Sequence, residues 1–548
     1  MHPVEILQGY RLGGHRATVE LQKAGTPGID IDFRVLDLVE DIRAGQVKSV
    51  ILTGTAGDGK TYLAYRVIDA LELDHAQIRA AQKDLGYDQD GVYIDLDLSA
   101  GALTDGRVQR LHQVLSAPDK LTLTCANEGK LSELEERFRS AGLNIPQTPL
   151  RINLSQRALV SPEAWERVWQ GVLDAPFWDS VDLDEAHVLA RNRAWLQDPI
   201  VKENVRHYLL LSYLMGEPIT VRELLSFLAY VLTGDLALEE AKQVSGDARA
   251  VLGYLVFNTL FSEPDGYIHG GRGLPGEKLL MWMFRFDPGV AANPEADLRL
   301  LTQLDQLDPR PPDELLDYWH TELVIQPGER SDTGYRQRTS VFMRYARRWY
   351  ALFSKKGHNA YFPFRYFGDY VEALSLPAED LEERVTVLVK GLNLLLSGGR
   401  VDDEFNLNLY HTSDLATSDQ SVIYSNTQVS YDDFSLTSDL PEDDETNAYL
   451  ERHPRRLYLG YPANAEPEAQ IHLPVSLLLH EVLMGAASPE SGFPATLWTK
   501  ERYVVARFMG ALNRKVKKTP VAQFVISIDQ DNELKLAHNA KKQSVKVT

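Results

Sequence analysis

The fold of the N-terminal part of this chain is decided by one stretch, Val50-Ile51-Leu52-Thr53-Gly54-Thr55-Ala56-Gly57-Asp58-Gly59-Lys60-Thr61. Its last eight residues fit the pattern G-x-x-x-x-G-K-[ST], which joins a strand to a helix through a glycine-rich loop. The apolar run at 50–53 predicts the strand, and the periodic segment at 62–71 predicts the helix. Glycines leave backbone N–H groups free to surround a phosphate, and the positive end of the helix faces the same anion. The spacing therefore predicts a phosphate-binding loop.

The loop residues have distinct expected roles toward ATP. Lys60 is expected to reach the β- and γ-phosphates, and the Thr61 hydroxyl is expected to bind Mg²⁺. The full set of residues expected to contact ATP in this loop is Gly54, Thr55, Ala56, Gly57, Asp58, Gly59, Lys60 and Thr61.

Hydrolysis also needs a carboxylate near the metal and a group that activates water, and two interpretations supply them. In the first, the strand at 92–97 supplies Asp95 to the Mg²⁺ shell, and Asn127 at the end of the next strand senses the γ-phosphate. In the second, the stretch 121–128 is the metal-binding strand and Glu128 activates water.

The first interpretation leaves Leu96 where a catalytic glutamate usually stands, so Asp97 or Glu128 would serve instead. We prefer it because the strand at 150–154 then leads directly into the helical region. The identity of the catalytic carboxylate stays open between Asp97 and Glu128.

Apolar patterning divides the chain into segments. Short buried runs alternate with amphipathic stretches from 46 to 160, which predicts an α/β core with a parallel sheet. Later stretches have long helical periodicity, and Thr220 with Glu223 forms a capping-box pattern that predicts a helix from Val221. The expected segments are an N-terminal lead-in (1–45), the α/β core (46–160), a helical lid (161–260), a helical region with a basic face (261–400), and an acidic loop-rich block followed by an α+β region (401–548).

Composition limits the class of protein. The chain has 548 residues, is 44% hydrophobic and 25% charged, and carries a formal charge of −21, which opposes non-specific nucleic-acid binding unless positive charge is concentrated locally. The single Cys125 excludes an intrachain disulfide and a cysteine-rich zinc cluster, and favours a reducing, cytoplasmic setting. No apolar run approaches the ~18 residues of a membrane span, so we expect no membrane association.

Positive charge is concentrated in two segments. Residues 334–367 hold eight Lys or Arg and no Asp or Glu, and the segment from Lys500 onward holds eleven basic and four acidic residues. Four basic residues of the first segment recur at helical spacing with aromatic residues between them, and we expect them to contact DNA phosphates: Arg344, Arg347, Arg348 and Lys355. Pairing with the acidic residues of 401–451, or with a protein partner, is the alternative explanation for this basic face.

Residues 46–260 resemble the AAA+ and STAND-like branch of P-loop ATPases. The resemblance implies that Asn127 is a nucleotide sensor and that Arg222, at the start of the helix from Val221, contacts the nucleotide. It also implies an arginine finger offered to a neighbouring subunit of a homo-oligomer, for which Arg137, Arg139 and Arg157 are candidates.

Within that branch, the order of parts is similar to ATPase components of bacterial anti-phage systems, the DptF-like family of phosphorothioation-dependent restriction. The residues behind this similarity are those at 57–61, 127–129, 220–230, 391–398 and 474–485. It implies an ATP- and Mg²⁺-dependent motor or switch that works with partner proteins of a defence assembly on DNA. The alternative is a nucleotide-gated scaffold that recruits partners with little or no hydrolysis, and Leu96 motivates it.

Overall fold

The chain forms two compact units, which are described separately. Unit 1 comprises Met1–Tyr213, Glu217–Pro363 and Glu442–His453, and unit 2 comprises Leu214–Gly216, Phe364–Pro441 and Pro454–Thr548. The computed structural model describes residues 2–11, 28–82, 86–99, 101–117, 119–144, 149–180, 183–184, 187–261, 277–323, 333–398, 404–410, 422–439, 448–488, 499–516, 521–527, 533–539 and 544–547.

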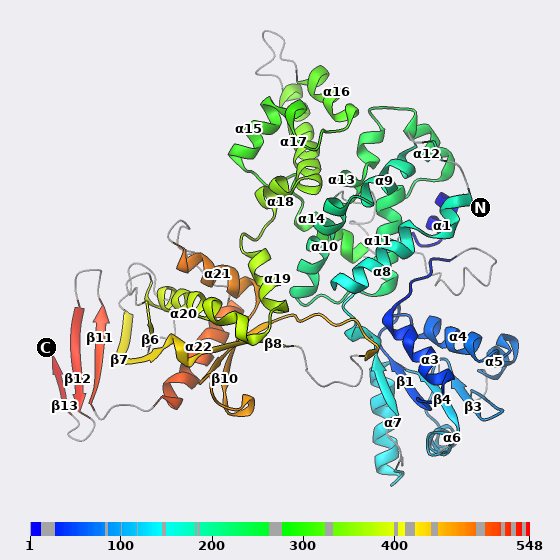
Figure 1. The fold of residues 1–548 in the computed structure, drawn as a ribbon, viewed down its shortest axis with the longest axis horizontal. Coiled ribbons are helices and arrows are strands. Elements are labelled where there is room, and N and C mark those ends of the chain that lie inside the picture. Colours follow the sequence, from blue (N-terminus) through cyan, green and yellow to red (C-terminus); the bar gives the residue numbers. More distant parts are fainter. Residues whose placement is uncertain are drawn as a thin grey trace. The chain divides into compact units, whose positions relative to one another are not determined.

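A five-stranded sheet forms the centre of the N-terminal part of unit 1 (Figure 1). Its strands are β1 (Ser49–Thr53), β2 (Tyr87–Gln89), β3 (Val92–Asp95), β4 (Leu121–Cys125) and β5 (Leu150–Asn153). The order is β2-β3-β4-β1-β5, and every pairing is parallel except that of β2 with β3. The predicted α/β core with a mostly parallel sheet is therefore confirmed, and the antiparallel edge strand β2 is an addition to it.

Helices cover both faces of this sheet. The helices α6 (Asp105–Leu115) and α7 (Glu128–Ser140) bury an apolar cluster with Ile51 and Tyr93 on one face. On the other face lie α3 (Asp37–Arg43) and α4 (Lys60–Ala70), with α5 (His75–Ala81) nearby (Figure 1). Burial of alternate strand residues toward two helical layers is what fixes the register of a sheet of this kind.

The rest of unit 1 is helical. Helix α11 begins at Val221, as the capping box predicted, because the Thr220 side chain accepts from the Glu223 N–H and the Glu223 carboxylate accepts from the Thr220 N–H. The other helices of this unit are α1 (Pro3–Gln8), α8 (Pro162–Leu173), α9 (Val188–Leu196), α10 (Pro199–Leu214), α12 (Leu238–Ser245), α13 (Val256–Thr259), α14 (Glu277–Arg285), α15 (Pro294–Thr302), α16 (Asp313–Glu322), α17 (Thr333–Phe353) and α18 (Lys355–Tyr361).

Unit 2 has α+β architecture, with antiparallel sheets in the orders β10-β9-β8 and β13-β12-β11-β7-β6. Helices α20 and α21 pack closely at Gly391, which has no Cβ. A Cβ at this position would lie only 2.2 Å from the Leu483 carbonyl oxygen. The elements of this unit are α19 (Phe367–Ser375), α20 (Glu382–Ser397), β6 (Asn406–Tyr410), β7 (Val422–Ser430), β8 (Ser435–Ser438), β9 (Leu457–Tyr461), β10 (Ile471–Val475), α21 (Leu477–Ala487), α22 (Thr499–Lys515), β11 (Val521–Ser527), β12 (Glu533–Asn539) and β13 (Ser544–Val547).

One sequence expectation changes in unit 2. The block from 401 was expected to be rich in loops, yet its described residues include the strands β6, β7 and β8. Much of its acidic sequence, at 401–403, 411–421 and 440–447, lies outside the described residues.

Among the residues that the structure describes, no helix is both long enough and apolar enough to span a bilayer.

Candidate functional site

The glycine loop between β1 and α4 has the backbone conformation that its sequence requires. Gly54, Gly57 and Gly59 have φ values of 140°, 100° and 93°, which residues with a Cβ rarely adopt. The loop begins directly after β1 and ends at Lys60, the first residue of α4. Three left-handed residues in such a short span turn the chain back on itself at the N-terminus of the helix, where backbone N–H groups are unpaired.

The Lys60 ammonium lies across this loop. Its Nζ donates to the carbonyl oxygens of Gly54 at 2.8 Å and of Thr55 at 2.7 Å. Burial lowers the pKa of Lys60, and the nearby Asp58 carboxylate opposes that shift. An anion bound in the loop would likewise favour the charged ammonium, so the position of Lys60 suits contact with a phosphate.

Asp58 holds the loop in shape. Its carboxylate is buried and accepts from the Thr55 backbone N–H at 2.6 Å, from the Thr55 hydroxyl at 2.9 Å and from the Ser155 hydroxyl at 2.6 Å. Ser155, in the 3-10 turn after β5, also accepts from the Thr55 N–H at 2.9 Å. Three donors thus meet one oxygen of the Asp58 carboxylate, Oδ2, and these contacts link the loop to Ser155. The role of Ser155 was not predicted, because nothing local in its sequence links it to the loop.

Other loop residues remain open to a ligand. Ala56 and Thr61 are exposed, and a Cβ on Gly59 would meet no other atom within 4 Å. The exposed Thr61 hydroxyl stands one residue after Lys60 at the start of α4. These open positions fit a nucleoside triphosphate bound with Mg²⁺. The phosphates would contact the loop N–H groups, and the metal would take the Thr61 hydroxyl as a ligand.

The first turn of α11 contacts the same loop. The Arg222 backbone N–H donates to the Gly57 carbonyl oxygen at 3.2 Å, and a Cβ on Gly57 would lie 3.1 Å from the Arg222 Cβ. The Arg222 charge also contributes to lowering the pKa of Lys60, after the larger effect of burial. The resemblance implied that Arg222 contacts the nucleotide, and the structure places its backbone N–H and Cβ beside Gly57 of the loop.

Two acidic residues, one at the end of β3 and one just after it, lie beside the end of β4. Burial is the main cause that raises the pKa of the Cys125 thiol to about 12, and Asp95 and Asp97 raise it further while Lys60 opposes them. The Cys125 thiol also lies 3.8 Å from the Lys60 carbonyl oxygen. The charges of Asp95, Asp97 and Lys60 thus all act on this buried thiol at the carboxyl edge of the sheet.

The carboxylate at the end of β3, Asp95, and that of Asp97, two residues later, differ in availability. Asp95 is buried, and the Arg107 guanidinium donates to it at 2.9 Å. Asp97 is exposed and its carboxylate accepts from the Ser99 N–H at 3.0 Å. Arg107 was not singled out from the sequence, since its partner lies on another element. Of the pair, Asp97 is the one free to meet water or a metal shell.

Asn127 and Glu128 occupy the turn from β4 into α7. The Asn127 side chain caps the helix by accepting from the Lys130 N–H at 2.8 Å. Glu128 forms an ion pair with Arg151 of β5, and its Oε1 has no hydrogen-bond partner among the described residues. Both side chains thus have structural contacts beside any role toward a nucleotide.

The three candidate arginine fingers differ sharply. Arg157 is buried and forms an ion pair of 3.4 Å with Glu451, and its guanidinium lies 4.2 Å from the centre of the Phe33 ring. Burial lowers the pKa of Arg157, and the Glu451 carboxylate opposes that shift. Arg157 is therefore not placed to reach a neighbouring subunit. Arg137 and Arg139 are in the last turn of α7, where Arg139 is exposed and Arg137 pairs with Asp105 at 3.3 Å.

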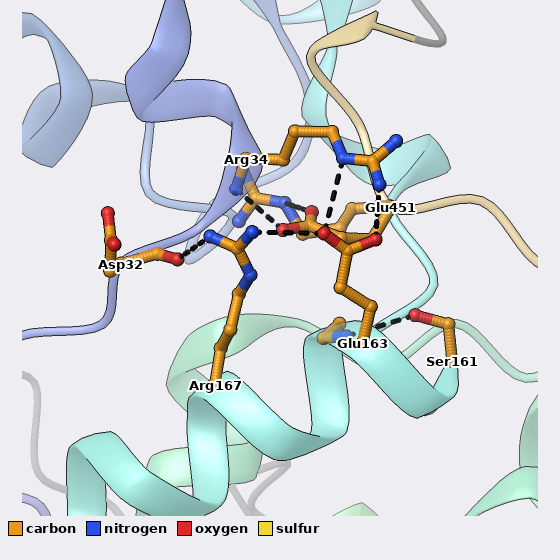
Figure 2. Close-up of polar contacts among 8 residues, drawn as sticks. Asp32, Arg34, Ser161, Glu163, Arg167 and Glu451 are labelled. Carbon is orange, nitrogen blue, oxygen red and sulfur yellow. Dashed lines mark hydrogen bonds and ion pairs between the residues drawn. The ribbon is translucent and has the colours of Figure 1, made fainter.

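Glu451 belongs to residues 448–453, which we call the strap, and the strap docks within unit 1. The Glu451 carboxylate accepts from the Arg34 N–H at 2.7 Å, and its carbonyl oxygen accepts from the Ala158 N–H at 2.7 Å. Figure 2 shows Glu451 beside Arg34, Glu163 and Arg167. Arg34 and Arg167 both donate to Glu163 of α8. The strap is thus anchored by both main-chain and side-chain contacts.

Two further hydrogen bonds hold the ends of the strap. The Tyr449 hydroxyl donates to Asp41 of α3 at 2.7 Å, and the Tyr213 hydroxyl donates to the His453 carbonyl oxygen at 2.8 Å. Leu450 between them is buried. Because Arg157 directly follows the turn that contains Ser155, the strap packs against the segment that supports the glycine loop.

The four basic residues expected on a DNA-binding face are not equivalent. Arg348 is buried and donates to both carboxylate oxygens of Asp287, at 2.8 and 2.7 Å. Arg347 donates to both oxygens of Asp297 at 2.7 Å. The expectation that these two side chains follow phosphates is corrected, because acidic partners on neighbouring segments already hold them. Arg344 and Lys355 are exposed.

Comparison with known proteins adds no family assignment. No protein-family model matches this sequence, and no curated protein matches it.

Proposed function

We propose that unit 1 is an AAA+-like ATPase core that binds Mg·ATP at the loop 54–61. The observation that carries this proposal is the placement of Lys60 across a loop with three left-handed glycines, at the N-terminus of α4. The sheet order adds support, because β1 lies between β4 and β5 and ligands of parallel sheets bind at the carboxyl edge where the strand order reverses. In the proposed complex Lys60 contacts the β- and γ-phosphates, and Arg222 approaches from α11.

The proposed roles of the remaining residues follow from their availability. Mg²⁺ would be held by the Thr61 hydroxyl and the phosphates, with Asp95 behind them oriented by Arg107. Asp97 is the exposed carboxylate proposed to orient the attacking water, with Glu128 as the alternative. Asn127 stands at the end of β4, next to β3, where a γ-phosphate sensor is expected.

We propose further that this ATPase is a motor or switch that acts on DNA with protein partners of a bacterial defence assembly. That part rests on the resemblance of the loop, the Asn127 turn and the Arg222 helix to ATPases of such systems. A second candidate, a nucleotide-gated scaffold with little hydrolysis, is favoured by one observation. Asp95 and Glu128 both form ion pairs with arginines, and among the described residues Asp97 is the one of these three carboxylates without such a partner.

Turnover of ATP by the purified full-length protein, with and without double-stranded DNA, separates the two candidates. For a DNA-dependent ATPase we expect Mg²⁺-dependent turnover that rises when DNA is added. An Asp97→Asn variant is expected to lose turnover by about a hundredfold, in the range of a lost general base, while it still binds ATP. ATP binding without turnover in either condition would support the scaffold, and turnover indifferent to DNA would contradict the proposed DNA action.

A further inference from the structure

A groove of about 540 Å³ lies in unit 1, where the first half of α17 faces the turn at 289–290. Its lining combines arginines, hydroxyl groups, glycine and apolar side chains, and no described carboxylate lines it. The lining residues are Gly289, Val290, Tyr335, Arg336, Thr339, Ser340, Met343, Arg344 and Arg347.

The acidic residues closest to the groove are already neutralised. Arg348 pairs with Asp287, and Arg347 pairs with Asp297 and donates to the Gly289 carbonyl oxygen at 3.1 Å. These buried and half-buried pairs fix the turn at 289–290 against α17. Any other arginine in the groove lining therefore adds a positive charge that these carboxylates do not neutralise.

Two arginines add such a charge. Arg336 and Arg344 are exposed, and neither forms an ion pair with a described residue, whereas Arg338 on the same helix lies 3.5 Å from Glu322. The stem of Arg344 is held against the turn, because a Cβ on Gly289 would lie 2.5 Å from the Arg344 Cγ. The stem of Arg344 thus lies at the turn that lines the groove.

Hydroxyl and apolar groups complete the lining. The Thr339 Oγ1 is buried and has no hydrogen-bond partner among the described residues, and the exposed Ser340 lies beside it in the sequence. A buried hydroxyl without a partner is unfavourable, and a ligand oxygen would supply the missing hydrogen bond. Tyr335 and the exposed Val290 offer flat and apolar contact surface.

We infer that this groove binds the phosphate backbone of a nucleic acid through Arg336, Arg344 and the hydroxyls of Thr339 and Ser340. The two arginines are eight residues apart on α17, which is about 12 Å along the helix. Along the duplex axis, where one strand carries a phosphate about every 3.4 Å, this length spans three to four phosphates. Arginine binds phosphate oxygens in pairs, and hydroxyls add single hydrogen bonds. The inference rests on the DNA action proposed above and replaces Arg347 and Arg348 as its contacts.

The test compares the salt dependence of binding of a 30-base-pair duplex by the wild type and by an Arg336→Ala/Arg344→Ala variant, without nucleotide. Each lost phosphate contact reduces the magnitude of the slope of log K against log salt by about 0.9. The slope of the double variant is therefore expected to be smaller than that of the wild type by about 1.8. Its affinity at 0.1 M salt is expected to fall by about ten- to a hundredfold. The matched control, Arg299→Ala/Arg310→Ala, removes two exposed arginines of unit 1 outside the groove and is expected to change the slope much less.

Two outcomes overturn the inference. The first is that the groove variant has the same salt slope and the same duplex affinity as the control variant. This includes the case in which neither the wild type nor any variant binds the duplex. The other is weakened binding of inorganic pyrophosphate with unchanged duplex binding, which would assign the groove to a free phosphate compound. ATP turnover without DNA is measured on the same variants and is expected to be unchanged. A failure of the ATPase proposal therefore remains separate from a failure of the groove.

Discussion

A Glu451→Ala variant is expected to lower the free energy of unfolding of unit 1 by about 3–5 kcal/mol, the usual loss when one partner of a buried ion pair is removed. The Glu451 side chain is fully buried against Arg157 and accepts the Arg34 N–H. Its loss leaves the Arg157 cation without compensation in a site whose burial already lowers the pKa of that group. Urea denaturation followed by tryptophan fluorescence reports on this unit, because seven of the eight tryptophans lie in it.

The control for this variant is Glu136→Ala, which removes an exposed carboxylate from α7 and is expected to change the free energy of unfolding by about 0.5 kcal/mol or less. An Arg157→Met/Glu451→Leu variant removes both charges and is expected to be more stable than Glu451→Ala alone. Equal stability of Glu451→Ala and Glu136→Ala would contradict the described docking of the strap.

An Arg348→Ala variant is the second large expected effect, again a loss of about 3–5 kcal/mol in the free energy of unfolding. Arg348 donates to Asp287, to the Asn258 side chain at 3.1 Å and to the Phe261 carbonyl oxygen at 2.9 Å, all in buried surroundings. Its removal leaves the buried Asp287 carboxylate unpaired. Urea denaturation measures the loss, and Arg344→Ala on the same helix is the control, with an expected change of about 0.5 kcal/mol or less.

The two arginine variants separate a structural role from a phosphate-binding role. Arg348→Ala is expected to lower stability while the protein that remains folded binds DNA as the wild type does. Arg344→Ala is expected to do the reverse. If Arg348→Ala left stability unchanged and weakened DNA binding, the correction made above for Arg348 would itself be wrong.

Local sequence signals predicted the parts of the candidate site that depend on neighbouring residues. The loop at 54–61 and the start of α11 at Val221 follow from spacing over a few residues, and glycine conformation and capping are local effects. The four parallel strands were recognisable because each is a short, mostly apolar run. The strand β2 was missed, since Tyr87–Gln89 is short and polar and gains its conformation by pairing with β3.

The contacts that change the interpretation of single residues are all long-range. Helical periodicity placed Arg347 and Arg348 on α17 but gave no sign of Asp297 or Asp287, which lie on other segments. Glu451 meets Arg34 across 417 positions of sequence, and no local pattern marks such a pair. The strands β6 and β7 were read as loop because Asn, Ser and Thr are common in them, and antiparallel pairing overrides that preference.

The measurement that tests the central claim most directly is a calorimetric titration of Mg·ATP into the wild type, Lys60→Ala and Lys48→Ala. Lys48 is the control, because it is an exposed lysine just before β1 whose one ion pair with a described residue is a 3.9 Å contact with Asp119. We expect the wild type and Lys48→Ala to bind equally. Lys60→Ala is expected to bind about a hundredfold more weakly, since charge-assisted hydrogen bonds contribute about 1.5–3 kcal/mol each. Absence of binding by the wild type, or equal binding by Lys60→Ala, would contradict the assignment of the loop at 54–61 as the ATP site.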